Sequence, residues 1–397
     1  MPRAAKPAPS KLRISAKAGR FTESVIREMT RVADRYGAIN LAQGFPDFPA
    51  PDALKEAAVR AIRGDVNQYA VTWGAPRLRA AIESYMARRR GVRIDADAQV
   101  TVTCGATEGM IAAMMGVLDP GDEVLVPEPF YENYGPDGIL SGAVPRFVPM
   151  GPGFRLDLGA LRAAIGPRTR GVVLNTPHNP TGRVFSPEEV RGLCDLVREH
   201  DLLLFTDEIY EEILFTGPHR CPLLEPGMAE RTLMVSGASK TFSVTGWRVG
   251  WVVSPPELTS GVRKVHDFLT VGAPAPLQEA VAEALAWEDA YFDAIQVEYR
   301  ERRDVMIAGL RAAGFGCEIP DGAYYVMVDV RAHQRPGEND VAFAMRLVEE
   351  AGVATVPGSS FYADPADGAG QVRFCYAKRM ETLRQAVTRL EQWSASA

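Results

Sequence analysis

Residues 171–210 read GVVLNTPHNPTGRVFSPEEVRGLCDLVREHDLLLFTDEIY, and this stretch decides the fold class. It begins with a short β-branched run over 171–174, which predicts a buried strand. A helix signal follows, because Ser186 precedes a proline and two glutamates at the start of a helical pattern that reaches about His200. A second apolar run over 202–206 predicts another strand. This order of elements indicates two parallel strands joined by a helix.

The same alternation of strand and helix patterns extends over residues 52–253. Further short apolar or β-branched runs predict strands at 100–103, 123–126, 144–148, 232–235 and 247–253. Helical periodicity with a favourable start is found at 76–90 and at 107–118. The pattern is typical of a mainly parallel sheet with helices on both faces, so we predict an α/β fold.

The pattern changes after residue 288, where a smaller α+β unit is expected. A long helix is predicted first, and the elements that follow it are shorter. They are the long helix at 289–313, strands at 324–328 and 371–376, a helix at 338–351 and a terminal helix from Glu381. A length of 397 residues also fits two domains, since a domain commonly has ~100–200 residues.

Composition and charge narrow the class of protein. Hydrophobic residues make up 46% and charged residues 24% of the chain, which is the balance of an ordinary globular protein and excludes a disordered or fibrous one. The net charge is −6 although the first twenty residues hold six Lys/Arg and no acid, so the body is acidic and nucleic acid is not an expected partner. No run resembles a membrane span or a signal peptide, so we expect no membrane partner and a cytoplasmic location.

Cysteine spacing and short motifs argue against several kinds of site. The five cysteines are scattered and contain no CxxC pair, so neither a disulfide framework nor a zinc site is suggested. HExxH, GxGxxG and a complete P-loop do not occur in the sequence. We therefore expect no bound metal.

Polar residues that directly follow strands are the first candidates for a site, because ligands of open α/β sheets bind beyond the carboxyl ends of the strands. Four predicted strand ends carry such residues. These segments are 104–107 (CGAT), 175–182 (NTPHNPTG), 207–210 (DEIY) and 236–240 (SGASK).

Lys240 has small and apolar neighbours in sequence instead of acids. Burial lowers the pKa of an ammonium group, and a neutral amine at the mouth of a cleft can condense with an aldehyde to form an imine. Arg248, eight residues on, is placed by the intervening turn to return toward the same site and clamp a phosphate. A lone lysine is more often a solvated surface group, but the position at a strand end favours chemistry.

Asp207 ends a buried apolar run, so its carboxylate lies at the edge of a low-dielectric sheet and needs a cationic partner. A protonated pyridine nitrogen would serve, and the phenol of Tyr210 could donate to a phenolate oxygen on the same ring. The alternative is that Asp207 caps the following helix, and both roles can coexist.

Two loops add to the candidate site. Prolines at 177 and 180 hold the loop after 171–174 rigid so that Asn179 can point inward, although turn chemistry alone explains the prolines. The step 105–107 enters a helix and exposes backbone N–H groups of a kind that bind phosphate.

Four motifs occur together in this chain. They are Asn179-Pro180-Thr181-Gly182, Asp207-x-x-Tyr210, Ser239-Lys240 with Gly246-Trp247-Arg248-x-Gly250, and Arg373-Phe374. In order and spacing they resemble the class I/II aminotransferases, pyridoxal-phosphate enzymes of fold type I, and the resemblance covers about residues 21–390. The segment INLAQGFPDF at 39–48 looks most like the kynurenine, glutamine and methionine aminotransferase branch. The implied organisation is a basic N-terminal arm at 1–20, a small domain formed by 21–50 and 289–397, and a large cofactor-binding domain at 51–288.

The resemblance implies catalytic roles that agree with the residue chemistry. Lys240 would hold pyridoxal 5′-phosphate as a Schiff base and move the proton between the substrate Cα and the cofactor C4′. Asp207 would keep the pyridine nitrogen protonated, so that the ring stays an electron sink. Asn179 and Tyr210 would bind the cofactor 3′-oxygen, and Tyr131 would stack on the ring.

The resemblance also implies how the phosphate and the substrate are bound. The groups expected on the phosphate are Gly105, Ala106, Thr107, Arg248, either Ser236 or Ser239, and Tyr69 of a neighbouring subunit. Because Tyr69 would come from another subunit, a homodimer is implied. The amino acid and 2-oxo acid substrates would be bound through the α-carboxylate by Arg373, with Gly44 and Asn179 completing the pocket.

The predicted reaction is transfer of the amino group of an L-amino acid, with a neutral or aromatic donor favoured, to a 2-oxo acid. The residues that the resemblance places near the substrate side chain are apolar, namely Phe21, Phe45, Val271 and Phe361. A second carboxylate would need a positive partner there, and Arg20 or Arg27 could supply one. An aspartate-type aminotransferase therefore stays an alternative, as does a β-lyase or cyclising enzyme on the same scaffold. A ligand-binding regulator would need an appended DNA-binding unit.

Overall fold

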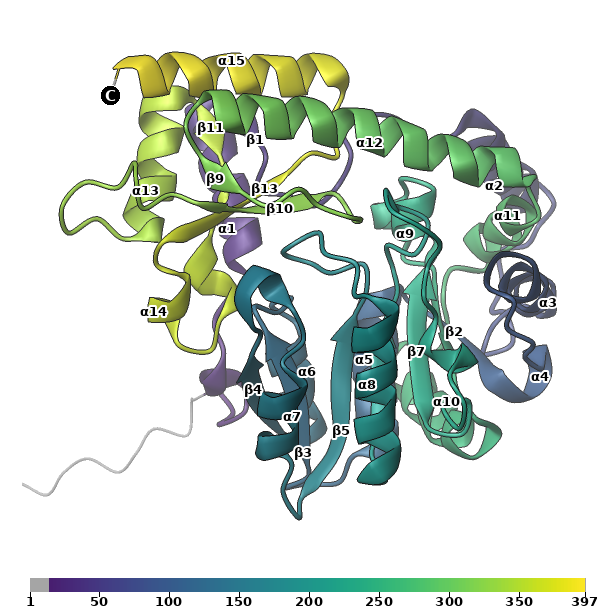
Figure 1. The fold of residues 1–397 in the computed structure, drawn as a ribbon. Coiled ribbons are helices and arrows are strands. Elements are labelled where there is room, and N and C mark those ends of the chain that lie inside the picture. The colour runs from purple at the N-terminus through teal and green to yellow at the C-terminus, as the bar shows by residue number, and fades with distance from the viewer. Residues whose placement is uncertain (1–13, 397) are drawn as a thin grey trace, which may run out of the picture.

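The computed structural model describes residues 14–396, and its main feature is a seven-stranded sheet (Figure 1). The strands lie in the order β2-β8-β7-β6-β5-β3-β4. Their bounds are β2 Val100–Thr103, β3 Glu123–Glu128, β4 Val144–Pro149, β5 Thr169–Asn175, β6 Leu203–Asp207, β7 Thr232–Gly237 and β8 Gly250–Val253. Strand β8 runs antiparallel to both of its neighbours, whereas the other pairs are parallel. The predicted α/β fold with a mainly parallel sheet is confirmed.

Helices cover both faces of this sheet because successive strand residues point to opposite faces. The helices of one face are α5 Ala106–Val117, α6 Tyr134–Ser141 and α10 Pro256–Thr270, and those of the other are α7 Leu158–Ala164 and α8 Pro187–Glu199. Val124 and Val126 of β3 belong to the core shared with the first group. Leu125, between them, belongs to the core shared with α7 and α8. Ser186 caps α8 through a capping box, as the sequence predicts.

A third group of helices packs beside β2 and β8, and the long helix α12 connects it to the C-terminal unit. The bounds are α2 Asp52–Arg63, α3 Pro76–Tyr85, α11 Ala275–Leu285 and α12 Asp289–Ala312. Phe292, near the start of α12, lies in the core formed by α2, α3 and α11. Leu310, near its end, lies in the core of the C-terminal unit. Figure 1 shows α12 running from one region to the other.

The C-terminal unit is built on a four-stranded sheet of order β12-β13-β10-β9. Its elements are β9 Gly316–Cys317, β10 Tyr325–Asp329, α13 Asp340–Arg346, β11 Val353–Ala354, β12 Val356–Pro357, α14 Pro365–Gly368, β13 Gln371–Cys375 and α15 Met380–Ser396. The N-terminal segment joins this unit, because β1 (Ile39–Asn40) pairs in parallel with β11. Residues of α1 (Val25–Tyr36) share a core with Val356.

The structure differs from the sequence expectations at a few places. The strand predicted at 247–253 begins only at Gly250, because Thr245–Trp247 form a 3-10 turn and Arg248 has a left-handed backbone with φ of 54°. The helices predicted at 76–90 and 338–351 both end in a π-helical turn, which apolar periodicity does not distinguish from an α-helical one.

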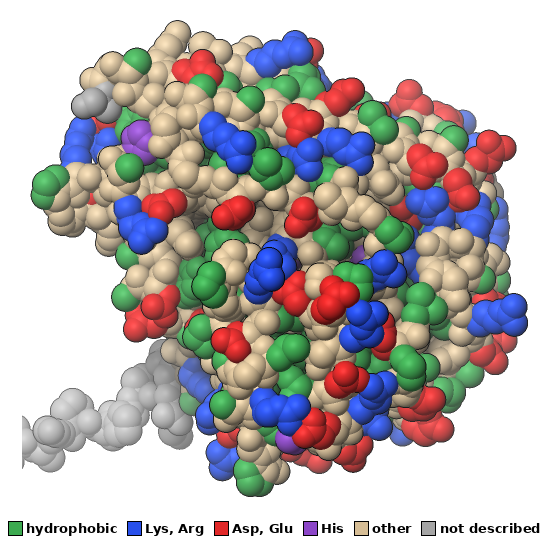
Figure 2. Space-filling model, viewed as in Figure 1, with side chains coloured by type: hydrophobic (Ala, Val, Ile, Leu, Met, Phe, Trp, Pro, Cys, Tyr) green, Lys and Arg blue, Asp and Glu red, His purple; other side chains and the backbone are tan. Residues whose placement is uncertain are grey.

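The N-terminal arm is described only in part. Residues 14–20 include a short 3-10 helix, and the Lys17 Nζ donates to the Leu140 carbonyl oxygen over 3.4 Å. Residues 1–13 of the predicted arm lie outside the described residues. Figure 2 shows positive and negative side chains interspersed over the face in view. No helix within residues 14–396 is both long and apolar enough to cross a membrane.

Candidate active site

A cavity of about 390 Å³ lies where the parallel strands end, and most of the predicted site residues meet there. Register explains this meeting, because Asn175 at the end of β5 pairs with Asp207 at the end of β6. The predicted residues that line the cavity are Gly44, Ala106, Thr107, Tyr131, Asn179, Asp207, Tyr210, Ser239, Lys240, Arg248 and Arg373. The predicted residues Tyr69, Gly105 and Ser236 do not line it.

Lys240 lies on a four-residue helix, α9 (Ala238–Thr241), that directly follows β7. Its Nζ donates to the Gly44 carbonyl oxygen over 3.0 Å and lies 5.6 Å from the centre of the Tyr210 ring. Burial lowers the pKa of the Lys240 amine to about 8, and the positive charges of Arg248 and Arg373 act in the same direction. A large fraction of this amine is therefore neutral near pH 8 and available as a nucleophile or base.

Asp207 is a buried carboxylate without an ion-pair partner among residues 14–396. Its Oδ2 accepts a hydrogen bond from the Tyr134 hydroxyl over 2.8 Å, and its Oδ1 accepts one from the Ile209 N–H over 3.2 Å. Burial raises the pKa of Asp207 to about 6, against the lowering effect of these two hydrogen bonds and of Lys240. Residues 209–212 form turns, so the helix that Asp207 was considered to cap from sequence is not formed. The Ile209 contact belongs to this turn and leaves the carboxylate facing the cavity in need of a cation.

Arg373 offers an unused anion site at the opposite wall. Its Nη1 donates to the Asn179 Oδ1 and its Nη2 to the Ala42 carbonyl oxygen, both over 2.8 Å. The guanidinium is fully buried between the rings of Tyr325 and Phe361, with its carbon 4.2 Å and 4.9 Å from their centres. Because both partners are neutral, the charge of Arg373 is free to bind a carboxylate.

The backbone around Gly44 holds the amine end of Lys240 in place. The Gly44 carbonyl oxygen accepts from both the Lys240 Nζ and the Tyr324 hydroxyl. A Cβ atom at Gly44 would lie 2.0 Å from the hydroxyl oxygen of Tyr325. That hydroxyl lies 3.0 Å from the Tyr210 hydroxyl, so any larger residue at 44 would disturb the tyrosine pair beside the lysine.

The start of α5 and Arg248 form the part of the cavity expected to bind phosphate. Ala106 and Thr107 line it from the first turn of α5, where backbone N–H groups are unpaired within the helix. Gly105 precedes them with φ of 83°, and a Cβ there would lie 2.3 Å from the Arg248 Nη2. Gly105 therefore acts by letting Arg248 come close. It does not face the cavity itself.

The two candidate serines lie in different surroundings. Ser239 lines the cavity, whereas the Ser236 Oγ donates to the Glu211 Oε1 over 2.6 Å on the far side of the strand end. Ser236 belongs to β7 and Ser239 to α9, so the backbone changes direction between them, and the structure places Ser239 but not Ser236 at the cavity. Tyr69 is 87% exposed in the single chain and lies off the cavity.

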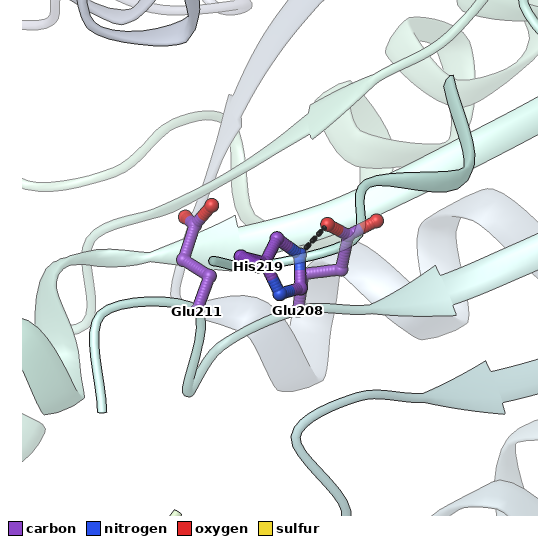
Figure 3. Close-up of side chains that lie close together, drawn as sticks. All are labelled: Glu208, Glu211 and His219. Carbon is purple, nitrogen blue, oxygen red and sulfur yellow. Dashed lines mark hydrogen bonds and ion pairs between the residues drawn. The ribbon is translucent and has the colours of Figure 1, made fainter. Parts of the chain in front are cut away.

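Behind Asp207 a buried group of charged side chains contains Glu208, Glu211 and His219. Figure 3 shows Glu208 and His219 facing one another, with 2.5 Å between the Glu208 Oε2 and the His219 Nε2. Their atoms are close enough together to suggest a metal site. However, Glu211 is already bound by the Arg90 Nε over 2.6 Å, so a protein cation occupies the position next to its carboxylate. We interpret the group as an ion-pair network that supports the turn after β6.

The comparisons with known proteins agree with this geometry. The family model for aminotransferase class I and II matches residues 36–390. The chain belongs to the class I and II aminotransferases. A probable N-succinyldiaminopimelate aminotransferase of Mycobacterium tuberculosis is 42% identical over 93% of this chain and 96% of that relative. The solved structure of the N-succinyldiaminopimelate aminotransferase from that organism has a TM-score of 0.92 and 40% identity, covering 96% of this chain and 100% of its own.

Two further relatives belong to the branch expected from sequence. The methionine aminotransferase of Escherichia coli is 38% identical over 93% of this chain and 95% of its own length. Human kynurenine–oxoglutarate transaminase 1 is 35% identical over 92% of this chain and 94% of its own length. The aminotransferase is therefore related to that branch, as predicted.

Aminotransferases of this class use pyridoxal 5′-phosphate, and the cavity fits this cofactor. The unpaired buried carboxylate of Asp207 suits a protonated ring nitrogen. The helix start at Ala106 together with Arg248 suits a phosphate. Lys240, with its lowered pKa, lies between these two ends as the amine that the aldehyde requires.

Several residues of the aminotransferase site were missed from sequence. Tyr134 is the first residue of α6, in the segment that follows β3 and carries Tyr131, so extending the strand-end argument by a few residues could have found it. Asn175, whose Oδ1 accepts from the Asn179 N–H over 2.7 Å, is likewise a strand-end residue. Tyr325 lies on β10 of the C-terminal unit and carries no local signal.

The side-chain end of the cavity differs from the apolar set expected. Phe45 lines the cavity, whereas the other three apolar residues, Phe21, Val271 and Phe361, do not. Phe361 packs on Arg373 instead. Of the two arginines considered, Arg27 lines the cavity and Arg20 does not.

Proposed function

We propose that Lys240, Asp207 and Arg373 carry the reaction of this aminotransferase, which takes the amino group from a neutral or aromatic L-amino acid and gives it to a 2-oxo acid. One observation carries the proposal: a half-buried lysine, a buried aspartate and a buried arginine, each without a partner of complementary chemistry, line one cavity. The Lys240 amine lacks an electrophile, the Asp207 carboxylate lacks a cation and the Arg373 guanidinium lacks an anion. An α-amino acid and pyridoxal phosphate together meet all three needs.

The cofactor, when bound, supplies a conjugated ring that delocalises the negative charge left when a proton leaves the substrate Cα. We propose that Asp207 holds the protonated ring nitrogen, with Tyr134 orienting its carboxylate. Tyr131 would pack against the ring, and Asn179 and Tyr210 would donate to the ring oxygen. Ala106, Thr107, Ser239 and Arg248, which all line the cavity, would bind the phosphate.

Lys240 has two tasks in this proposal, because its amine first holds the cofactor covalently and then acts as a base. With the cofactor bound and the substrate amine in its place, the neutral Nζ would be positioned to take the proton from the substrate Cα and to return it on the cofactor side. Its pKa of about 8 suits both directions of transfer near neutral pH. The Gly44 carbonyl oxygen, 3.0 Å away, keeps the amine on the cavity side of α9.

Arg373 would bind the α-carboxylate of the donor and of the 2-oxo acid in turn. Its Nη1 contact with the Asn179 Oδ1 orients the plane of the guanidinium so that two parallel N–H bonds can form. The same group therefore positions both substrates over Lys240.

The donor class rests on Phe45 and Ile26, which give the side-chain end an apolar surface. The relatives named above are described as acting on N-succinyldiaminopimelate, methionine or kynurenine. We propose that glutamine, methionine and phenylalanine are better donors than aspartate, whose short side chain would bury its second carboxylate unpaired. An aspartate-type preference and a β-lyase or cyclising activity are the alternatives.

A donor panel with and without 2-oxo acid tests this function. With donor alone, a transaminase converts one equivalent and stalls until 2-oxoglutarate or pyruvate is added. A lyase continues without an acceptor and would contradict the proposal. Comparison of kcat/KM across the donors decides the substrate class, since aspartate above methionine and phenylalanine would overturn the donor preference.

A homodimer completes the proposal, with Tyr69 of one subunit reaching the phosphate of the other. Tyr69, at 87% exposure, and Phe268, at 92%, are large apolar side chains that a subunit interface would cover. Light scattering tests the dimer, and Tyr69→Phe should weaken cofactor affinity. We also propose that the chain divides into a small domain (21–50 and 289–397) and a large domain (51–288), which limited proteolysis would test. We further propose a cytoplasmic location, which cell fractionation would test.

A further inference from the structure

Arg27 is a cation of the cavity wall that has no task in the proposed reaction. It lies in the first turn of α1, which begins at Val25, and it lines the cavity beside Gln43 and Phe45. Arg373, on β13, is reserved for the α-carboxylate and is bound to Asn179. Among residues 14–396, the cavity thus has three guanidiniums: Arg373 is buried, whereas Arg27 and Arg248 are exposed. Arg248 is assigned to the phosphate, so Arg27 alone has no task.

The start of α1 is fixed to the cavity wall, so the position of Arg27 is defined. The Ser24 Oγ caps the helix by accepting from the Arg27 N–H over 3.3 Å. The same hydroxyl donates to the Glu132 Oε1. Glu132 follows Tyr131 in the segment after β3 and also lines the cavity. The segment that carries Tyr131 therefore holds the turn that carries Arg27.

The charge of Arg27 is not neutralised within the described part of the chain. Its guanidinium forms no ion pair or hydrogen bond with any side chain or carbonyl of residues 14–396, whereas Lys240, Arg248 and Arg373 each donate to one. Three acids, Glu132, Asp137 and Asp207, line the cavity with Arg27, and none of them is bonded to its guanidinium. Glu132 accepts from Ser24, and Asp207 accepts from Tyr134 and is assigned to the ring nitrogen. Burial raises the pKa of Asp137 well above its usual range, which favours the uncharged form of this carboxyl.

We propose that Arg27 binds the distal carboxylate of a dicarboxylic substrate, an amino acid or 2-oxo acid whose side chain ends in a carboxylate, while Arg373 binds its α-carboxylate. The inference rests on the proposed function. A neutral substrate leaves Arg27 in solvent, where it already is, so neither half-reaction is penalised. One site can then accept a neutral donor and a dicarboxylic acceptor in turn.

Paired acceptors test this role in the holoenzyme, with methionine as the constant donor. The pair is 2-oxoglutarate and 2-oxopentanoate, which have the same number of carbons but differ in the distal carboxylate. Loss of one charge-assisted contact should lower kcat/KM for 2-oxoglutarate by about tenfold in Arg27→Gln. The value for 2-oxopentanoate should be unchanged, and Arg27→Lys should restore part of the loss because the charge returns.

Arg31→Gln is the matched control. Arg31 lies one turn further along the same helix, is exposed, and pairs with Glu23 instead of lining the cavity. Arg31→Gln should leave kcat/KM unchanged for both acceptors. If Arg27→Gln lowers kcat/KM for both acceptors equally, or for neither, Arg27 does not bind the distal carboxylate and the proposal is overturned.

Binding without turnover gives a second measurement. Glutarate and pentanoate are unreactive, and their dissociation constants follow from the absorbance change of the lysine-bound cofactor. Wild-type enzyme should bind glutarate more tightly, and Arg27→Gln should remove that difference. Failure of methionine to react with either acceptor would count against the proposed function, whereas normal turnover with an equal glutarate affinity in both proteins would count against Arg27 alone.

Discussion

The two walls of the cavity are built differently. The wall formed by strand ends carries Asp207, which is buried, and Lys240, which is half-buried. Asp207 accepts a hydrogen bond from Tyr134, and Lys240 donates one to the Gly44 carbonyl oxygen. The wall formed by α1 and the segment at 43–45 carries Arg27 and Phe45, which are exposed. Reacting groups need fixed geometry and a low dielectric, whereas groups that select a side chain must tolerate different substrates. Arg373 comes from the C-terminal unit, but it is buried like Asp207 in the strand-end wall.

The largest effect is expected for Lys240→Ala, which removes the reacting group of the strand-end wall. Turnover should fall by at least about 10²–10⁴-fold, since a general base and the covalent attachment are lost together. The cofactor should still bind noncovalently. Single-turnover absorbance measures both, and near-normal turnover would show that another amine carries the proton.

Asp207→Ala should come next, because the ring nitrogen loses its counter-charge and the substrate carbanion is less well delocalised. The rate of proton transfer should fall by more than the affinity for the cofactor. Rapid-mixing spectra of the half-reaction report the first and equilibrium dialysis the second. Unchanged half-reaction rates would remove Asp207 from the mechanism.

Arg373→Lys tests whether the buried guanidinium acts as a substrate clamp. Replacing a bidentate contact by a point charge should raise KM by about tenfold or more for the amino donor and the 2-oxo acid alike. Both must be affected, because the two substrates use the same clamp in successive half-reactions. A defect in only one of them would assign another task to Arg373.

Asp207 should make the cofactor-free protein less stable as pH rises. Its pKa of about 6 in the folded state exceeds the ordinary 3.8, so folding favours the protonated form and stability is lost as pH rises from about 4 to 6. Asp207→Asn avoids this loss and should stabilise the apoprotein at pH 8 by up to about 3 kcal/mol. Urea unfolding at pH 8 and pH 4 measures the difference in free energy of unfolding between Asp207→Asn and the wild type. A difference that is larger at pH 4 than at pH 8 would contradict this prediction.

The smallest effects separate the two serines at the same strand end. Ser239→Ala should weaken binding of the cofactor phosphate by about 1 kcal/mol, the contribution of one hydrogen bond. Ser236→Ala should lower the free energy of unfolding by a similar amount, because it leaves the buried Glu211 carboxylate with one donor fewer. Cofactor titration and denaturation of both variants should therefore give opposite patterns, and equal loss of cofactor affinity would place Ser236 in the site after all.

Local signals found the strand-end wall because its residues follow buried strands directly. Asp207, Asn179 and Lys240 each stand within a few residues of a β-branched or apolar run, and parallel register brings those ends together. Trp247 was misassigned to a strand because its neighbours are apolar, although the backbone must first turn at Arg248. Tyr325 was missed because its partner Tyr210 is far away in sequence.

The sequence by itself determined the fold class, the reacting residue types and the edge of the sheet where they meet, since periodicity and strand ends are local properties. Only the tertiary structure decided that Ser239 and not Ser236 lines the cavity, because Ser236 is bonded to Glu211 from the end of β7 whereas Ser239 lies beyond the strand on α9. It also decided that Arg27 lines the cavity. That placement depends on β1 pairing with β11, which joins segments more than three hundred residues apart, and no local pattern encodes such a contact.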